Sequence, residues 1–135
     1  MPVKTRSSKC KQFAQILKGK VIASKNRLCV VQRIRNIKAT VLNRRTRSPL
    51  VKAALFSFES PDKQGRTLNL GETVILQREI NPFISVLRRN KIKVTALHNH
   101  WLFEKPRLFY IHFESKEKPL RFARKVAKAF TVLKK

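Results

Sequence analysis

Several short segments have the composition of β-strands, and one of them, residues 53–60, alternates hydrophobic and polar residues with the period of two that is typical of a strand with one buried face. These segments are residues 20–24, 27–33, 37–42, 53–60, 72–76, 91–102 and 107–114. The turn residues Lys25 and Asn26 and the β-branched content of the first three segments predict a three-stranded meander. Between residues 53 and 60, Phe56 and Phe58 share one face.

Three other segments carry hydrophobic residues at spacings of three and four, which predicts amphipathic helices. Their apolar stripes are Cys10, Phe13, Ala14 and Leu17; Ile80, Phe83, Ile84 and Leu87; and Leu120, Ala123, Val126, Ala127, Phe130 and Leu133. We expect Ser8 to cap the first helix and Gly19 to end it at C′. The fold class predicted is α+β: a mainly antiparallel sheet with packed helices, and a C-terminal β-hairpin followed by a terminal helix.

The length of 135 residues fits one domain, which we place at residues 8–135 after a flexible basic arm at residues 1–7. The apolar runs are short and interrupted by Lys or Arg, so we expect no transmembrane segment. No signal peptide is visible, and we expect a cytoplasmic location. Cys10 and Cys29 form no C-x-x-C pair and are interpreted as two small hydrophobic residues in a reducing compartment.

Positive charge is the strongest feature of the composition. Thirty-two Lys and Arg against seven Asp and Glu give a formal net charge of +25. Residues 1–58 hold fifteen of the basic residues and no acidic one, whereas residues 59–135 hold seventeen basic residues and all seven acids. Such a field attracts polyanions, and it predicts RNA, DNA or an anionic membrane surface as a partner.

All three histidines of the chain, His98, His100 and His112, fall in the predicted C-terminal hairpin. Side chains alternate along a strand, so His98 and His100 project from the same face. A four-residue turn centred near Lys105 would place residue 98 opposite residue 112, with their Cβ atoms about 5 Å apart. The pattern therefore predicts three imidazoles meeting in a partly covered pocket, although a slip of one residue would turn His112 away.

Three neutral imidazoles with open positions suit a divalent transition metal, namely zinc, iron, manganese, nickel or copper. The expected ligands are His98, His100 and His112, with Glu59, Glu79 or Glu104 as the fourth. Two alternatives stay open at this point. The histidines are half-buried hydrogen-bonding groups beside Tyr110, or they form a His-based acid–base site that works without metal.

The segment from Thr95 to Phe113 contains T-A-L-H-N-H, then P-R, then a further histidine. It resembles the LppY/LpqO-like family of uncharacterised bacterial domains, and Gly71-Glu72 and the string E-I-N-P from Glu79 are similar to other elements of that family. The motif maps onto Glu79, Asn81, Pro82, His98, Asn99, His100, Pro106, Arg107 and His112. The resemblance implies no activity, and tandem units in some relatives imply a homodimer here.

Two functional hypotheses follow, and whether the protein is an enzyme stays open. In the first, the histidines form a metal-dependent or His-based site, Glu79 or Glu59 supplies a catalytic carboxylate and Arg107 holds an anionic substrate group. In the second, the protein binds nucleic acid through phosphate contacts without catalysis. The residues expected to do so are Arg44, Arg45, Arg47, Arg121, Arg124, Lys125 and Lys128. No P-loop, dinucleotide fingerprint or nucleophile elbow is present.

Overall fold

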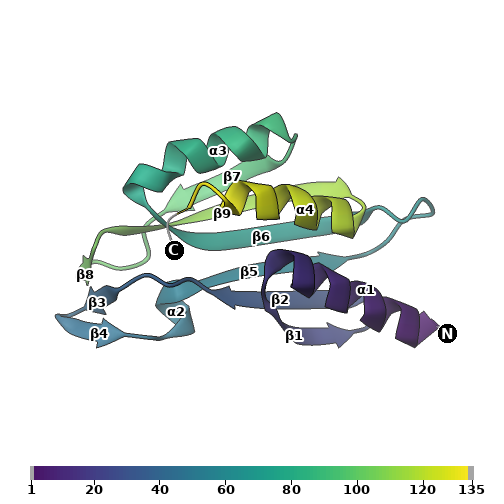
Figure 1. The fold of residues 1–135 in the computed structure, drawn as a ribbon, viewed down its shortest axis with the longest axis horizontal. Coiled ribbons are helices and arrows are strands. Elements are labelled where there is room, and N and C mark those ends of the chain that lie inside the picture. Colours follow the sequence, from purple (N-terminus) through teal and green to yellow (C-terminus); the bar gives the residue numbers. More distant parts are fainter. Residues whose placement is uncertain (1, 134–135) are drawn as a thin grey trace.

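The computed structural model describes the backbone of residues 2–133 and the side chains of residues 8–133 (Figure 1). Its helices are α1 (Pro2–Leu17), α2 (Pro49–Lys52), α3 (Ile80–Arg89) and α4 (Pro119–Phe130), with a 3-10 turn η1 (Gln77–Glu79) before α3. Its strands are β1 (Lys20–Lys25), β2 (Leu28–Ile34), β3 (Ala39–Val41), β4 (Arg44–Thr46), β5 (Ala53–Glu59), β6 (Thr67–Leu76), β7 (Lys93–His98), β8 (Glu104–Lys105) and β9 (Leu108–Glu117). The predicted α+β class is confirmed.

Six of the strands form one antiparallel sheet in the order β1-β2-β5-β6-β9-β7, and the other three form a small sheet in the order β4-β3-β8. The predicted meander is therefore wrong in its third strand. β1 and β2 pair through a turn at Asn26 and Arg27, both with positive φ, but β2 continues to β5. β3 leaves the large sheet and pairs with β4 and β8.

Helices α1, α3 and α4 pack on one face of the large sheet, where they enclose the main core (Figure 1). With the exception of Ala127, the residues of the apolar stripes predicted for all three helices belong to this core or pack against it, and ring contacts connect the helices. Phe13 of α1 stacks on Phe122 of α4 at 6.4 Å, and Phe83 of α3 meets the edge of Phe130 at 5.6 Å. Burial of these large rings away from water supplies the main driving force for this layer.

The opposite face of the same sheet is covered at one end only. Val74 and Tyr110 point there, whereas their neighbours Ile75 and Ile111 point into the main core. A second cluster forms around them from the small sheet and α2, and it consists of Ile37, Ala39, Val51, Val74, Leu76, Leu108 and Tyr110. The rest of this face carries half-exposed or exposed residues such as Leu70, and the histidines lie at the boundary between the two parts.

The C-terminal end of α1 differs from the prediction. Lys18, with φ of 58°, occupies the left-handed C′ position, and Gly19 follows it, donating its amide to the Ala14 carbonyl at 2.9 Å. Glycine is required at position 19 because a Cβ there would lie 2.5 Å from Cγ1 of Val31 and 2.8 Å from the carbonyl oxygen of Gln32. At the other end α1 begins at Pro2, and the side chains of the basic arm expected at residues 1–7 lie outside the described residues.

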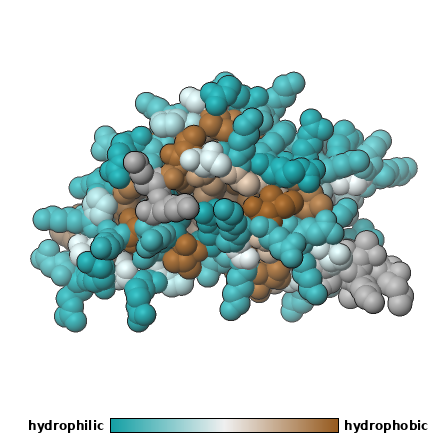
Figure 2. All heavy atoms as spheres, viewed as in Figure 1, coloured by the Kyte–Doolittle hydropathy of each residue, from teal (hydrophilic) through white to brown (hydrophobic). Residues whose placement is uncertain are grey.

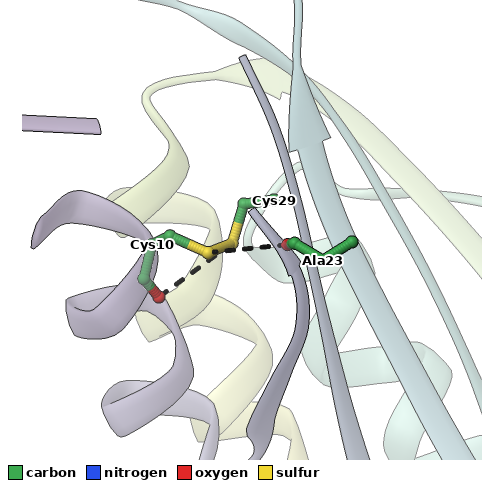
Figure 3. The surroundings of a disulfide bond; sticks show 3 residues. All are labelled: Cys10, Ala23 and Cys29. Carbon is green, nitrogen blue, oxygen red and sulfur yellow. Dashed lines mark hydrogen bonds between the residues drawn. A yellow bond between two sulfur atoms is a disulfide. The ribbon is translucent and has the colours of Figure 1, made fainter. Parts of the chain in front are cut away.

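Cys10 and Cys29 form a disulfide bond, so the interpretation of two separate small hydrophobic residues is wrong (Figure 3). Their Cα atoms are 5.7 Å apart, and the carbonyl oxygen of Ala23 lies 4.0 Å from the Cys10 sulfur. The bond joins α1 to β2, two elements that are separated in the sequence and lie side by side because α1 packs on the large sheet. Because the two cysteines are bonded to each other, they no longer favour a reducing compartment.

Hydrophilic side chains cover most of the face shown in Figure 2, with apolar atoms gathered in patches between them. This agrees with the high content of Lys and Arg, which keep their charged ends in water. Among residues 2–133, no helix is both long enough and apolar enough to cross a membrane.

Candidate metal centre

The histidines are positioned by the hairpin of β7 and β9. Its register differs from the prediction by two residues: His98 lies opposite Tyr110, and His112 lies opposite Ala96. A shift of two residues keeps every side chain on its predicted face, because the strand period is two. His98 and His112 therefore share a face as expected. A register irregularity between Val94 and Ala96 lies just before the site.

The three imidazoles lie together, and one nitrogen from each ring lies within 4.8 Å of the nitrogens from the other two. The Nε2 atoms of His98 and His112 are 3.0 Å apart, and the rings of His98 and His100 stack with centroids at 4.6 Å. His98 and His100 are exposed and His112 is half-buried, so the site is more open than the predicted pocket. His100 lies beyond the end of β7, and its ring reaches the cluster from the following loop.

A carboxylate approaches this cluster from the neighbouring strand. Glu72 of β6 lies opposite His112 in the register of β6 and β9, and its Oε1 is 3.4 Å from Nδ1 of His112. The Nε2 of the same ring faces His98. A carboxylate on one ring nitrogen orients the imidazole and increases the basicity of the other nitrogen, the arrangement that is common behind metal-binding histidines. The sequence analysis quoted Glu72 only as part of a motif and did not identify it as a site residue.

Tyr110 fixes the position of His100. Their rings are nearly parallel, with centroids 3.9 Å apart and an angle of 7° between planes. The Tyr110 hydroxyl donates to the Val51 carbonyl at 2.8 Å and accepts from the Trp101 indole at 2.9 Å. Burial raises the pKa of Tyr110 to about 12, so the side chain is a neutral phenol at physiological pH. The Tyr110 ring therefore supports the ring of His100 by stacking, while its hydroxyl is hydrogen-bonded to Val51 and Trp101.

The pKa of His100 is lowered, first by partial burial and then by His98, with Glu72 acting in the opposite direction. A lowered pKa favours the neutral imidazole, which is the form that binds a metal ion. The geometry therefore favours His100 as a neutral nitrogen ligand at a solvent-accessible place.

The loop between β7 and β9 is held by Asn99 and Glu104. Asn99 donates its side-chain amide to Oε2 of Glu104 at 2.6 Å and to the carbonyl of Leu108, and the Leu108 amide donates to the same Oε2 at 3.1 Å. Burial acts to raise the pKa of Glu104, but hydrogen bonds from Leu108 and Asn99 and the charge of Arg107 outweigh it and lower the pKa. Asn99 thus anchors the loop from the inside, between two histidines that point to the site.

The carboxylates expected as fourth ligands lie elsewhere in the structure. Both oxygens of Glu79 bind the guanidinium of Arg35, at 2.9 and 3.0 Å, in a fully buried pair. Glu104 is engaged in the loop just described, and Glu59 ends β5. Among residues 2–133 the group of side chains close enough to share one ion contains the three histidines alone. Arg107, expected to hold a substrate anion, lies with Nε 3.7 Å from Oε2 of Glu104.

A shallow groove of about 330 Å³ runs along the open part of the sheet and reaches the site. Leu70, Glu72, Thr95 and His112 are among its lining residues. It places open space beside the carboxylate-bound histidine, on the side away from the small sheet.

The basic residues expected to bind nucleic acid divide into two groups. Arg44, Arg45 and Arg47 are exposed in and next to β4 of the small sheet, and Arg121, Arg124, Lys125 and Lys128 belong to α4. Two of the second group contact Glu117: Nζ of Lys125 is 2.6 Å from Oε1, and Nε of Arg121 is 3.7 Å from it. Because the small sheet and α4 cover opposite faces of the large sheet, the two groups lie on opposite sides of it.

Comparison with known families gives one match, whose description is Domain of Unknown Function (DUF1259), over residues 11–132. Comparisons with curated proteins and with solved structures give no match. The matched range extends from within α1 to just past the end of α4 and contains Cys29, the histidine cluster and Glu72, with Cys10 one residue before its start. The expected resemblance is thus confirmed as membership of an uncharacterised domain family. The chain belongs to the family described as Domain of Unknown Function (DUF1259).

Proposed function

We propose that the protein binds a divalent transition-metal ion through His98, His100 and His112, with Glu72 holding the ring of His112. The observation that carries the proposal is the convergence of three ring nitrogens within 4.8 Å. Two ligands at 2.0–2.1 Å from a tetrahedral ion are roughly 3.3 Å apart. The separation of 3.0 Å between the Nε2 atoms of His98 and His112 is close to that value.

The arrangement resembles catalytic metal sites more than structural ones, because three protein ligands leave the ion a position open to solvent. An ion bound in this way acts as a Lewis acid and increases the acidity of a bound water. The residues of the chain contribute orientation: Tyr110 fixes the ring of His100, and Glu72 fixes that of His112. Zinc, iron, manganese, nickel and copper all suit an imidazole site, and the proposal is of a metal-binding protein of unassigned reaction.

Metal binding is tested with the full chain carrying no polyhistidine tag, stripped with a chelator and titrated with Co²⁺ and Zn²⁺. We expect one equivalent to bind, with a Co²⁺ absorption spectrum typical of a tetrahedral nitrogen site. His100→Ala and His112→Ala are expected to lose more affinity than the roughly 10–100-fold that removal of an orienting partner costs. Binding that is absent, or unchanged in both variants, would mean that the rings only hydrogen-bond to one another.

The role of Glu72 has a matched control on the same sheet face. Glu72→Gln is expected to weaken metal binding by about 10–100-fold, since a neutral amide would hold the ring of His112 less strongly than the carboxylate, whose Oε1 lies 3.4 Å from Nδ1. Glu114 lies two residues after His112 on β9 and also lines the groove, so Glu114→Gln removes the same charge close to the site and serves as the control. Equal losses in the two variants would reduce the effect of Glu72 to general electrostatics.

We further propose that the protein associates with polyanions, on the basis of its net charge of +25 and the exposed arginines of β4. Binding to RNA or DNA is expected to be independent of sequence and to weaken steeply with salt, because released counterions drive it. Arg44→Gln together with Arg45→Gln should reduce the slope of log affinity against log salt by about two. A slope that does not change would contradict a contact at β4.

Three finer predictions remain proposals: an LppY/LpqO-like identity within the family, a homodimer, and a cytoplasmic location. The Cys10–Cys29 disulfide favours an oxidising compartment over the cytoplasm. Thiol labelling of cells lysed in denaturant distinguishes the two locations, because the buried cysteines then react if a reducing cytoplasm kept them as thiols and do not react if they form the disulfide.

A further inference from the structure

A cavity of about 470 Å³ lies at the end of the helical layer, away from the histidines. It is bounded by the C-terminal ends of α1 and α4 and by the end of β2, three elements that converge there (Figure 1). Its volume is within the range of about 300–1,000 Å³ that small-molecule pockets occupy. The lining residues that matter for its chemistry are Ile16, Lys18, Arg33, Arg35, Phe130 and Leu133.

One wall of the cavity is apolar and carries a fixed guanidinium. Ile16, Phe130 and Leu133 supply the apolar surface. The Cζ atom of Arg33 lies 4.8 Å from the centre of the Phe130 ring, and its Nη1 donates to the carbonyl of Leu17 at 3.4 Å. Stacking on an aromatic ring and one hydrogen bond orient the guanidinium, and among residues 8–133 most of its five donors have no protein acceptor.

The charges around the cavity do not balance. Arg35 is matched by the carboxylate of Glu79, but within residues 8–133 neither Arg33 nor Lys18 forms an ion pair. Two helix C-termini add a partial negative charge of about 0.5 each, roughly −1 against +2 from the two side chains. The local field is therefore positive. Burial, and after it the neighbouring positive charge of Arg35, lower the pKa of Arg33.

We propose that this cavity binds a small organic anion, a carboxylate with an apolar chain, with Arg33 gripping the carboxylate. The planar guanidinium matches a carboxylate in a bidentate manner, and Lys18 adds charge at the opening. The chain of the ligand covers Ile16, Phe130 and Leu133, which an inorganic anion would leave exposed to water. The site is independent of the proposed metal centre, because no histidine lines it.

The test uses calorimetric titration of the full chain with octanoate, and with acetate and inorganic phosphate as comparison ligands. Octanoate is expected to saturate a single site, while acetate and phosphate bind far more weakly because they lack the chain. Arg33→Gln should weaken octanoate binding by about 10–100-fold, the usual value of hydrogen bonds to a charged partner. Arg88→Gln removes the same charge from an exposed position on α3 outside the cavity and should leave binding unchanged.

A second variant guards against a loss of folding in Arg33→Gln. Ala127 lines the cavity, and Ala127→Phe fills its apolar part without removing a charge. It should abolish octanoate binding while leaving the weak response to phosphate. The proposal is overturned if octanoate binds Arg33→Gln or Ala127→Phe as well as it binds the unaltered chain. It is also overturned if acetate competes equally, which would indicate unspecific attraction of anions to a highly positive protein.

Discussion

Replacing Glu79 with glutamine is expected to lower the free energy of unfolding by about 3–5 kcal/mol, because it leaves Arg35 as a buried charge with no compensating carboxylate. The side chains of Arg35 and Glu79 are 4% and 2% exposed, so water cannot take the place of the lost partner. Glu79 also accepts the amide of Leu76 at 2.9 Å, and Arg35 donates to the Val74 carbonyl at 3.1 Å. The pair therefore ties the segment after β2 to the junction of β6 and α3.

Urea unfolding followed by circular dichroism measures this loss. Asp62→Asn, which breaks the exposed pair with Arg66, should have a far smaller effect because solvent screens that pair. The double variant Arg35→Met with Glu79→Leu should recover most of the stability, since an apolar pair of similar size removes both charges at once. If Glu79→Gln instead proves as stable as the unaltered chain, the Arg35–Glu79 pair does not hold the junction.

The same variant separates two roles for Glu79. The sequence analysis considered it as a catalytic carboxylate or a metal ligand, and the structure gives both of its oxygens to Arg35. A role in folding predicts lost stability with unchanged metal affinity in the molecules that remain folded. A role as a metal ligand predicts lost metal affinity with unchanged stability. Measured together, metal titration and unfolding decide between them.

The elements were predictable where one period of the hydrophobic pattern dominates, as in α3, α4 and β5. Their partners were not, because pairing depends on segments far apart in the chain. Residues 37–42 have the composition of a strand, but β2 finds its next neighbour in β5, and β3 joins a separate sheet. The disulfide was missed for the same reason, since nothing in the sequence separation of 19 between Cys10 and Cys29 indicates that α1 folds back onto β2.

The meeting of His98 and His112 was predictable because it depends only on strand parity, whereas the loop after β7 places His100. The register error of two residues left His98 and His112 on the same face, whereas an error of one would have separated them. Glu72 was missed because its position opposite His112 arises from the pairing of β6 with β9, across 40 residues of sequence. A local signal existed in the alternation along β6, where Leu68, Leu70 and Glu72 share the open face, but it does not identify the neighbouring strand.

Reduction of the Cys10–Cys29 disulfide is expected to lower the free energy of unfolding by about 3 kcal/mol, because the open chain gains conformational freedom when unfolded. The bond closes a loop with a sequence separation of 19, near the loop length for which the chain-entropy estimate gives that value. It also holds α1 against β2 beside buried Phe13 and Leu17, so we expect the helix to separate from the sheet first when the bond is absent.

Urea unfolding with and without reductant compares the two states with identical side chains. The double variant Cys10→Ala with Cys29→Ala provides the control, since its midpoint should not respond to reductant at all. Amide hydrogen exchange should show faster exchange in α1 than in α4 after reduction, because α4 keeps its own contacts with α3 and β9. The prediction is contradicted if the protein, unfolded without reductant, shows two free thiols in a thiol assay. In that case packing alone would hold α1 to the sheet, and the disulfide would no longer favour an oxidising compartment.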